Sequence, residues 1–479
     1  MSNDIATQSA ASYYPTLRFE PDVVEKLGRP GPRYTSYPTA DRFDSHFGYA
    51  NYLEAVAALR MRATQSPLSL YVHIPFCATV CYYCACNKVV TRDRGKAAIY
   101  LGYLKQEIGM QALLFQGMRQ VDQLHFGGGT PTYLDDGQME ELTGYLRGEF
   151  DFLPDQQGEY SIEIDPRTVT PERVHRLREQ GFNRISLGVQ DFDPTVQAAV
   201  NRVQPEAETL AVMRAARAAG YRSISVDLIY GLPYQTLDTM RVTLEKVIAA
   251  GPDRIALYNY AHMPHLFKPQ RRIDEAAMPP ASVKLDLLAL CINTLCGAGY
   301  VYIGMDHFAR PDDELAVAQR QGRLHRNFQG YSTHAGANLV ACGVSAISAV
   351  GNTYSQNAKT LDEYYAALDE GRLPVARGKR MNTDDLLRRI VIQALMCNFE
   401  LSTSAIEQAY PIQFWSYFAA ERPQLEALAR DGLLALEPEW ISVSLKGRLL
   451  IRNICMVFDR YLMQAVAPDP QPLRYSRTI

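Results

Sequence analysis

The sequence lacks an excess of charge of either sign. Its 479 residues include 49 lysines and arginines and 52 aspartates and glutamates, so the net charge is −3. A nucleic-acid-binding domain usually carries a dense basic face, and the total charge shows no such bias. We therefore expect any anionic ligand to be bound by a local group of basic residues.

The sequence also lacks an export signal and a membrane span. Its first twenty residues contain Asp4 and Glu20 and no apolar core behind a basic flank. The longest apolar stretch, residues 287–305, is interrupted by Asn293, Thr294, Gly297 and Gly299. This pattern favours a buried helix followed by a strand over a bilayer crossing. We expect a cytoplasmic protein whose cysteines are reduced rather than paired in disulfides.

The nine cysteines are distributed unevenly. Cys77, Cys81, Cys84 and Cys86 lie within ten residues of one another. No second pair of cysteines or histidines with zinc spacing follows, so a zinc knuckle is only a minor alternative for this group. The scattered cysteines lie in apolar surroundings, and we interpret them as small buried hydrophobic residues. They are Cys291, Cys296, Cys342, Cys397 and Cys455.

From about residue 67, short β-rich runs alternate with longer segments of helical periodicity. The helical spacing is clearest in residues 99–115, 139–146 and 207–219. Parallel strands need crossover connections of this kind, so we predict an α/β fold built on a partial parallel (β/α)6 barrel. The six predicted strands are Leu68–Ile74, Val121–Phe126, Tyr160–Ile164, Arg184–Val189, Ser223–Ile229 and Arg254–Asn259.

Unusual residues follow the predicted strands. In a parallel barrel the carboxyl ends of the strands form one rim, where the chemistry gathers. Five strands are followed in turn by the four cysteines, Gly127–Pro131, Asp165–Arg167, Gln190–Asp191 and Tyr230–Pro233. Packing alone does not explain five such strand ends, so we expect the active site at this rim.

The segments on either side of the barrel differ from it in pattern. Residues 1–66 are rich in ring-bearing and turn residues and show little periodicity, so we predict an N-terminal arm. Residues 67–375 form the predicted catalytic domain. Residues 376–479 are predicted to be a mainly helical, winged-helix-like domain, with a hairpin at Leu433–Val443 and a helix from Gly447 to about Met463. It lacks a dense basic recognition helix, which favours a lid or docking role over DNA binding.

The spacing of Cys77, Cys81 and Cys84 predicts an iron–sulfur site. Three thiolates in one tight loop can bind three irons of a 4Fe–4S cubane and leave the fourth iron without a protein ligand. An open metal position is where a substrate can bind, as in catalytic zinc sites. We predict that Cys86 is not a fourth ligand, because it would close that position.

The gaps of three and two residues, with an aromatic residue before the last cysteine, resemble the signature of radical S-adenosylmethionine (SAM) enzymes. The resemblance implies that SAM chelates the open iron and is cleaved to a 5′-deoxyadenosyl radical. Gly127–Pro131 matches the glycine-rich element that binds the amino end of the methionine moiety in that family. Glycines at this place also permit a close approach of the backbone to a ligand.

Further segments resemble bacterial oxygen-independent coproporphyrinogen III oxidases, over the chain from about Gly31 to its end. The resemblance implies oxidative decarboxylation of two propionates of coproporphyrinogen III to vinyls, which yields protoporphyrinogen IX for haem biosynthesis. It also implies a monomer with an external electron donor such as flavodoxin or ferredoxin. The matching segments are Arg33–Thr39, Cys84–Lys88, Gly304–Ala309 and His325–Tyr331.

The same resemblance implies two bound SAM molecules. The residues matching the site of the cluster-bound molecule are Tyr71, Gly128, Glu163 and Ile347. Those matching the second site are Tyr83, Gly129, Thr130, Gln190, Arg202, Asp227 and Ala261. An ordinary salt bridge is an equal alternative for Arg202 and for Glu163. Two positions depart from the family pattern, since Tyr83 replaces a frequent phenylalanine and Ala85 replaces a glycine.

Other residues are expected on the substrate side of the site. Cys86 is predicted to be a thiol that acts on the substrate. His307 and His325 are candidate proton donors, although a lone histidine is more often structural. Guanidinium groups suit bidentate carboxylate recognition, so basic residues are candidates for binding the substrate's propionates. They are Arg33, Lys88, Arg92, Arg310, Arg323 and Arg326.

Two alternatives stay open at this point. The first is a haem-binding chaperone on the same fold, which is disfavoured because the related haem-chaperone-like proteins lack a cysteine at the position of Cys86, and because the Arg33–Thr39 segment is present. The second is a radical SAM enzyme that acts on another substrate. It would form 5′-deoxyadenosine without consuming coproporphyrinogen.

Overall fold

Six parallel strands lie side by side, in chain order, at the centre of the computed structural model, which describes residues 27–28, 30–62, 66–463 and 475. The strands are β1 (Leu68–Ile74), β4 (Gln120–Gly128), β6 (Glu159–Ile164), β7 (Arg184–Gln190), β8 (Ser223–Tyr230) and β9 (Arg254–Asn259). They coincide with the six predicted strands, with ends shifted by at most two residues. The predicted partial parallel barrel is thereby confirmed.

Side chains alternate along these strands between two environments. In β6 the odd-numbered residues are half-buried and the even-numbered ones are buried, and β7 and β8 repeat the alternation in part. Successive side chains of a strand point to opposite faces, so the buried apolar residues face the helices. The half-buried face is polar, and it carries the side chains from which a site can be built.

The sheet continues beyond the six strands at both ends, in a single open path. Beside β1 lie β14 (Asn338–Cys342), β15 (Ile347–Val350), β16 (Thr353–Asn357) and β17 (Val375–Arg380). Beside β9 lie β11 (His307–Ala309) and β10 (Val301–Gly304). The apolar stretch at residues 287–305 forms the end of α9 (Ala281–Gly297) and β10, which agrees with the predicted helix and strand.

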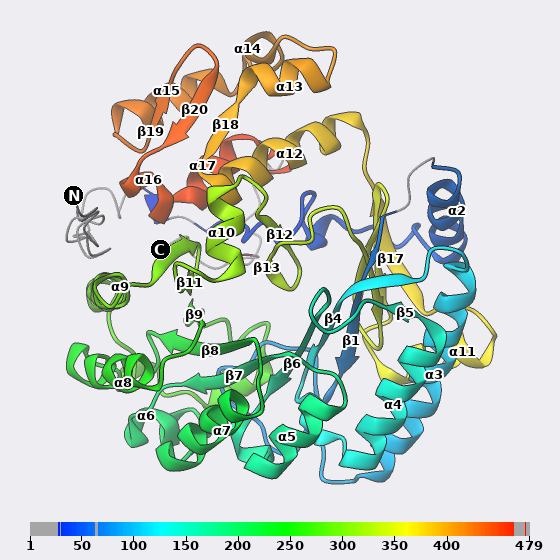
Figure 1. Cartoon of the computed structure of the whole chain (residues 1–479). Helices are drawn as coiled ribbons and strands as arrows, with labels where there is room; N and C mark the ends of the chain where they lie inside the picture. The colour runs from blue at the N-terminus through cyan, green and yellow to red at the C-terminus, as the bar shows by residue number, and fades with distance from the viewer. Residues whose placement is uncertain (1–26, 29, 63–65, 464–474, 476–479) are drawn as a thin grey trace, which may run out of the picture.

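Helices cover the outer face of the barrel (Figure 1). They are α3 (Gly95–Leu114), α4 (Asp136–Glu149), α5 (Pro171–Glu179), α6 (Pro194–Ala199), α7 (Glu206–Ala218) and α8 (Leu237–Ala250). Their N-terminal signals are local. The Asp135 side chain accepts from the Gln138 amide at the start of α4, and Thr236 accepts from Thr239 at the start of α8. Side-chain caps of this kind satisfy amides that have no partner within the helix.

The described part of the N-terminal segment contains a helix that the sequence analysis did not predict. This helix, α2 (Tyr49–Arg60), packs against β15, β16 and β17. Only Tyr52, Ala55, Val56 and Leu59 are buried on it. This apolar face has only four residues, one of them small and one aromatic, so the sequence shows little helical periodicity. Tertiary packing supplies most of the stability of such a helix.

The C-terminal residues form a separate layer of helices above the barrel in Figure 1. The predicted hairpin is present as β19 (Leu434–Leu436) and β20 (Trp440–Val443), and β18 (Glu400–Ser402) joins it as a third strand. The helices before and between them are α12 (Thr383–Asn398), α13 (Thr403–Ala409), α14 (Phe414–Tyr417) and α15 (Arg422–Arg430).

The single long helix predicted from Gly447 to about Met463 is wrong. The structure has α16 (Leu445–Leu449), α17 (Ile451–Val457) and α18 (Arg460–Met463) instead. Within α17 the Arg452 side chain donates to the Pro32 carbonyl oxygen (3.0 Å) and Asn453 donates to that of Leu27 (2.8 Å). A continuous amphipathic helix would have apolar residues at these buried positions. Here the positions are polar, and the N-terminal segment supplies their hydrogen-bond partners.

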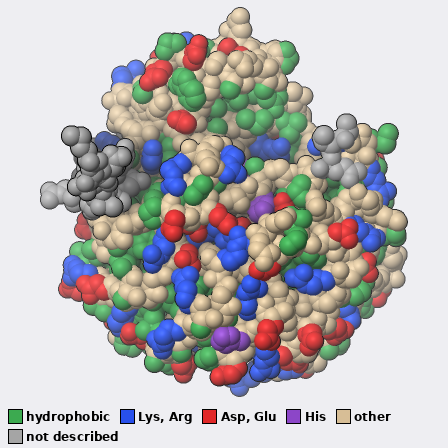
Figure 2. All heavy atoms as spheres, viewed as in Figure 1, with side chains coloured by type: hydrophobic (Ala, Val, Ile, Leu, Met, Phe, Trp, Pro, Cys, Tyr) green, Lys and Arg blue, Asp and Glu red, His purple; other side chains and the backbone are tan. Residues whose placement is uncertain are grey.

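Charges are mixed over the molecular surface. Figure 2 shows Lys and Arg side chains interspersed with Asp and Glu over the face seen in Figure 1. In the part of the chain that the structure describes, every helix is too short or too polar to cross a lipid bilayer.

Candidate active site

The cysteine loop begins at the carboxyl end of β1. It starts with a two-residue strand, β2 (Phe76–Cys77), which pairs in parallel with β3 (Val89–Val90). The Cys84 amide donates to the Cys81 carbonyl oxygen (3.3 Å). The pairing and this bond fold the segment back on itself, so the three predicted ligands occupy one short loop at the barrel rim.

Polar groups from other elements surround two of the sulfur atoms. Cys77 Sγ lies 3.5 Å from Thr130 Oγ1. Cys81 Sγ accepts hydrogen bonds from Arg202 (3.5 Å) and Arg167 (3.7 Å). Cationic donors stabilise a thiolate, and hydrogen bonds to the sulfur tune a metal-bound one. The surroundings of Cys81 therefore fit a negatively charged ligand sulfur.

Cys84 and Cys86 differ in their protonation. A hydrogen bond with Cys86 and the charge of Lys88 outweigh burial and lower the pKa of Cys84 to about 5. The same hydrogen bond raises the pKa of Cys86. Burial raises the pKa of Cys77 to about 11, and a thiol must lose its proton when it binds a metal. Of these three cysteines, Cys84 alone is set to be a thiolate at neutral pH.

The loop supplies three thiols, which is the number of protein ligands that a 4Fe–4S cubane with one open iron takes. Within the described residues, no three His, Cys, Asp or Glu side chains converge on one point as the ligands of one ion would. A cubane takes one thiolate on each iron, so its ligands need not converge. All nine cysteines are free, and the five scattered ones are buried, as predicted.

The glycines at the carboxyl end of β4 lie close to the backbone that leads into the cysteine loop. Gly128 has φ = +116°, a backbone conformation that favours glycine. A Cβ on Gly129 would lie 2.6 Å from the Pro75 carbonyl oxygen. The Gly129 amide donates to Ile74 O (2.8 Å) and the Thr130 amide donates to Phe76 O (2.9 Å). This close backbone contact explains the glycines before any ligand is considered.

A first polar group lies on the half-buried face of β1, β4 and β6. The Tyr71 ring stacks on His125 with centroids 5.8 Å apart. His125 Nε2 lies 3.0 Å from Glu163 Oε1, and the Gly128 amide donates to Glu163 Oε2 (3.3 Å). Burial alone would raise the pKa of Glu163. The hydrogen bond and charge of His125 outweigh burial, so the pKa is lowered. Glu163 is thus a carboxylate held beside the glycine backbone.

Arg202 is the buried centre of a second polar group. It pairs with Asp165 (3.1 Å) and donates to the Gly188 carbonyl oxygen (2.6 Å), in addition to the contact with Cys81. Asp165 also pairs with Arg167 (2.6 Å). The salt-bridge alternative for Arg202 is therefore present in the structure, next to the predicted cluster ligand.

A cavity of about 530 Å³ lies beside the cysteine loop. Cys84, Ala85 and Cys86 form one wall, and Arg33 of the N-terminal segment lines another. This volume is in the range of sites that bind organic ligands. The cavity also brings together four of the predicted SAM residues, namely Tyr83, Gln190, Asp227 and Ala261.

Two residues of the cavity lack ordinary partners. Burial and the charge of Glu163 raise the pKa of Asp227 to about 7, and its contact with the Ser186 hydroxyl is long, at 3.5 Å. Gln190 has φ = +68°, and its buried Oε1 accepts no hydrogen bond from the described residues. Buried polar atoms without partners mark a place for a ligand.

The remaining predicted SAM residues lie outside the cavity lining. His125 links Tyr71 to Glu163, and the Gly128 amide donates to Glu163. Thr130 and Arg202 border the cysteine sulfurs instead, and Gly129 packs against the backbone of Pro75 and Phe76. Ile347 lies in the same sheet, two strands from β1, and packs against a separate apolar group that contains Phe43. No hydrogen bond, ring contact or cavity in the described residues brings Ile347 to the others.

Some cavity residues were missed from the sequence. Tyr258, Asn259 and Tyr260 line the cavity at and just after the end of β9, and the Asn259 Oδ1 atom is buried without a partner among the described residues. The signal was available, because β9 was predicted and its carboxyl end belongs to the same rim. Only the residues that follow the first five strands were predicted to lie at the rim.

Among the six basic candidates, Arg33 alone lines the cavity. It forms an ion pair with Asp306, and its guanidinium lies 5.7 Å from the Tyr258 ring centre. Lys88 donates to the Cys84 carbonyl oxygen (3.1 Å). Arg326 is buried against Tyr331, and Arg310 lies over Tyr300. Arg323 bonds to Gln321, and Arg92 is exposed.

The two histidine candidates are neutral. Burial lowers the pKa of His307 to about 3 and that of His325 to about 4. The Nδ1 atom of His307 is buried without a partner in the described part of the chain. A neutral imidazole can still donate one hydrogen bond, but neither ring is a charged acid at physiological pH.

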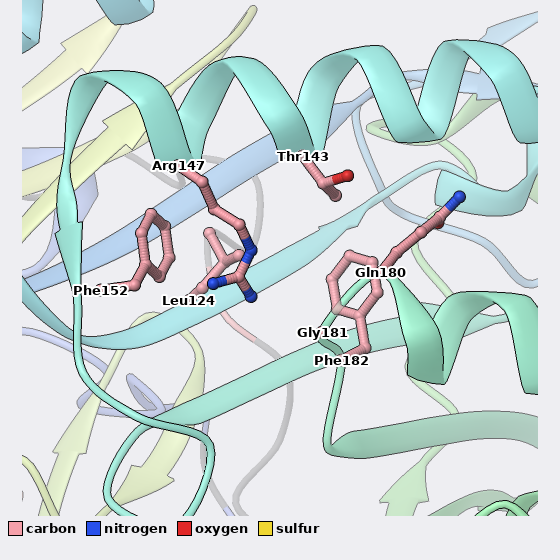
Figure 3. Close-up of a pocket in the computed structure, with 7 residues that line it drawn as sticks. All are labelled: Leu124, Thr143, Arg147, Phe152, Gln180, Gly181 and Phe182. Atoms are coloured by element: carbon pink, nitrogen blue, oxygen red, sulfur yellow. The ribbon is translucent and has the colours of Figure 1, made fainter.

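A second hollow lies between the loops that precede β6 and β7, at the amino ends of the strands. Figure 3 shows the Arg147 side chain extending into it, next to Phe152 and Gly181. Its volume is about 10 Å³, which is no more than one water molecule occupies. The guanidinium lies 4.9 Å from the Phe152 ring centre. This hollow is a packing feature of the barrel, far too small for an organic substrate.

Two protein-family models match parts of this chain. Residues 71–247 match the radical SAM superfamily model, and residues 381–450 match the model of the HemN C-terminal domain. The first match contains the cysteine loop, the glycines and most predicted SAM residues.

Individual relatives match nearly the whole chain. The oxygen-independent coproporphyrinogen III oxidase of Pseudomonas aeruginosa is 51% identical over 97% of this chain and 99% of its own. That of Escherichia coli is 51% identical over 92% of this chain and 95% of its own. A solved structure of E. coli coproporphyrinogen III oxidase (HemN), described as a radical SAM enzyme, superposes with a TM-score of 0.88 at 49% identity. It covers 93% of this chain and 100% of that one.

Proposed function

Because this chain belongs to the oxygen-independent coproporphyrinogen III oxidase family of radical SAM enzymes, we propose that it converts two propionates of coproporphyrinogen III to vinyls without oxygen. The product would be protoporphyrinogen IX, for haem biosynthesis. The observation that carries the proposal is the cavity of about 530 Å³, where Cys84, Cys86, Asp227 and Arg33 share one space.

Cys77, Cys81 and Cys84 would hold a 4Fe–4S cluster. When bound, the cluster and SAM supply a 5′-deoxyadenosyl radical that takes a hydrogen from the propionate β-carbon. The residues around the loop stabilise the ligand sulfurs, with Arg202 and Arg167 donating to Cys81 and Thr130 lying beside Cys77. Such neighbours orient ligands and tune the metal they bind.

We assign the SAM-binding residues to two groups. Tyr71, Gly128 and Glu163, with Ile347, would bind the SAM molecule on the cluster. Tyr83, Gly129, Thr130, Gln190, Arg202, Asp227 and Ala261 would bind a second one. The free Oε1 of Gln190 and the weakly bonded Asp227 support the second site. Arg202 is already paired with Asp165, so it would bind a ligand only by contacting the ligand and Asp165 at the same time.

Replacing Asp227 by alanine is expected to reduce the amount of SAM bound at saturation towards one molecule per chain. Asp227 would accept hydrogen bonds from the ribose hydroxyls or the amino group of the second molecule, and charged acceptors contribute about 1.5–3 kcal/mol each. Equilibrium dialysis against labelled SAM measures the stoichiometry. Asp238→Ala, at an exposed carboxylate on α8, is the matched control.

The same site should respond to pH. The carboxyl of Asp227 has a pKa of about 7, so it is neutral below that pH and accepts less strongly. Second-site binding should therefore weaken as the pH falls through 7 and should lose this dependence in Asp227→Asn. A stoichiometry of one in the parent protein at every pH would remove the second site.

Replacing Arg33 by glutamine is expected to raise the KM for coproporphyrinogen by at least about tenfold, since a charge-assisted hydrogen bond to a carboxylate contributes about 1.5–3 kcal/mol. The substrate carries four propionates, and Arg33 is the one cation among the described residues that line the cavity. Its partner Asp306 keeps the guanidinium in place before the substrate binds.

Steady-state kinetics and SAM cleavage without substrate should be measured together for this variant. Cleavage should stay unchanged, because Arg33 contacts no predicted cluster ligand. Arg310→Gln is the control, since Arg310 lies over Tyr300 outside the cavity lining. An unchanged KM in Arg33→Gln would place the propionates elsewhere.

The activity itself is tested with anaerobically reconstituted protein, dithionite, SAM and coproporphyrinogen. Release of carbon dioxide and appearance of vinyl products are the expected results. Formation of 5′-deoxyadenosine without those products would indicate another substrate. Neither product, with haem transferred to an acceptor protein, would indicate a chaperone.

We further propose the setting in which the enzyme works. It would be a cytoplasmic monomer with an external flavodoxin or ferredoxin as electron donor. Its parts would be an arm (residues 1–66), a catalytic domain (67–375) and a helical C-terminal domain (376–479). The arm and the catalytic domain jointly line the cavity through Gly31, Arg33 and the barrel residues, which supports a single working unit.

A further inference from the structure

One exposed strip of the surface adjoins the cysteine loop. We define it as Val90, Arg92, Arg94, Lys96 and Ile99, all of which are exposed. Between residues 88 and 96 the chain carries four cations and one carboxylate, Asp93. The chain as a whole has slightly more acidic than basic residues. The strip is therefore positively charged, whereas the chain as a whole carries a small net negative charge.

Folding does not account for these cations. Lys96 lies in the first turn of α3, which contains no acidic residue, and a positive charge there opposes the helix dipole. Within the described ranges neither Arg92 nor Lys96 forms an ion pair. Arg94 differs, since it donates to the Tyr133 carbonyl oxygen. Arg92 and Lys96 are thus free to bind something outside the chain.

The apolar members of the strip are also unusual. Val90 is 45% exposed and Ile99 is 59% exposed, so both belong to the exposed large apolar side chains of the described structure. In the sequence Val90 and Ile99 flank the three cations, and protein-binding surfaces combine an apolar centre with a polar, charged rim.

The segment that carries the strip is hydrogen-bonded to a predicted cluster ligand. Val90 is the register partner of Cys77 in the pairing of β2 with β3. The Thr91 amide donates to the Cys77 carbonyl oxygen (3.0 Å). One hydrogen bond therefore connects the backbone of the strip to the residue that would hold an iron.

The strip lies outside the lining of the cavity. The cavity is lined by Cys84, Ala85 and Cys86, and no residue from 87 to 99 lines it. The substrate can therefore occupy the cavity while a protein covers the strip.

We propose that this strip is the docking surface for the protein that reduces the cluster, an acidic one-electron carrier of the flavodoxin or ferredoxin type. The proposal rests on the proposed function, which needs electrons delivered singly to the cluster. In each transfer the carrier loses one electron and the cluster gains one, and no atom changes place. A carboxylate-rich face would complement Arg92 and Lys96, and such complementarity mainly speeds and orients a transient encounter.

The test compares Arg92→Glu, Lys96→Glu and the double variant with the parent enzyme, using purified bacterial flavodoxin as the probe. We expect the double variant to bind oxidised flavodoxin at least about tenfold more weakly at low salt, since paired charges of this kind alter association rates by about 10–10³-fold. Calorimetric titration measures the Kd. In the parent the Kd should rise with salt, and this dependence should be reduced in the variant.

Turnover with photoreduced flavodoxin should fall in parallel with binding, while turnover with saturating dithionite should stay at the parental rate. Arg430→Glu is the control, because Arg430 is exposed on α15 in the C-terminal layer, away from α3 (Figure 1). Unchanged flavodoxin affinity in the double variant, with dithionite turnover intact, would overturn the docking proposal alone. Absence of dithionite turnover in the parent would instead overturn the proposed function.

Discussion

A Cys84→Ser protein is expected to lose its iron–sulfur cluster and, with it, all SAM cleavage. The ligand to iron is the thiolate, and a serine hydroxyl keeps its proton at neutral pH. Cys84 is one of three ligands in a single loop, so removing it leaves two. We expect turnover to fall by more than about a hundredfold, because even a neighbour that only orients a metal ligand contributes about 10–100-fold.

Iron and sulfide quantification, the absorption spectrum and 5′-deoxyadenosine formation should be measured on anaerobically reconstituted protein. All three should decline together. Far-ultraviolet circular dichroism should stay unchanged, since the loop lies at the barrel rim rather than in the core. A variant with parental iron content would mean that another residue completes the site, and Cys86 is the nearest cysteine.

A Cys86→Ser protein is expected to keep its cluster and its SAM cleavage but to lose the decarboxylation. Cys86 is exposed and lines the cavity. It lies only two residues from Cys84, and a fourth cysteine ligand would close the open iron. If the thiol exchanges a hydrogen with the substrate, its loss should cost about 10²–10⁴-fold in turnover, as for other groups that transfer protons.

Comparison of this variant with Cys84→Ser separates the two cysteines. Parental iron content and 5′-deoxyadenosine formation, together with loss of vinyl products, would support a substrate-side thiol. Loss of the cluster in Cys86→Ser would show that Cys86 is a ligand. Parental turnover would show that the thiol has no part in the reaction.

The barrel could be predicted because its signals are local. Each parallel strand is a short β-rich run followed by a helical segment, and the chain enters them in spatial order, so sequence order and neighbour order coincide. The predicted bounds of β1, β7 and β9 differ from the structure by at most one residue. Helix α2 and the divided C-terminal helix were not predicted, because their stability comes from contacts with distant segments.

The candidate site was predictable in part for the same reason. The cysteine spacing lies within eight residues, and the glycines directly follow a strand. Tyr258 and Asn259 were missed although they lie at the end of a predicted strand. Arg33 was one of six basic candidates, and the sequence could not single it out. Its position in the cavity depends on an ion pair with Asp306, 273 residues away in the chain.

Short-range patterns were thus enough to predict the cluster motif and the barrel, and several short segments carried the family resemblance. Tertiary contacts alone decided that Arg202 is already paired with Asp165 and that Arg33 reaches the cavity. They also decided that the basic strip lies outside the cavity lining. The physical reason is that short-range patterns record the local geometry of helices, strands and loops. The partners of a long side chain depend on which distant segments the fold brings within its reach.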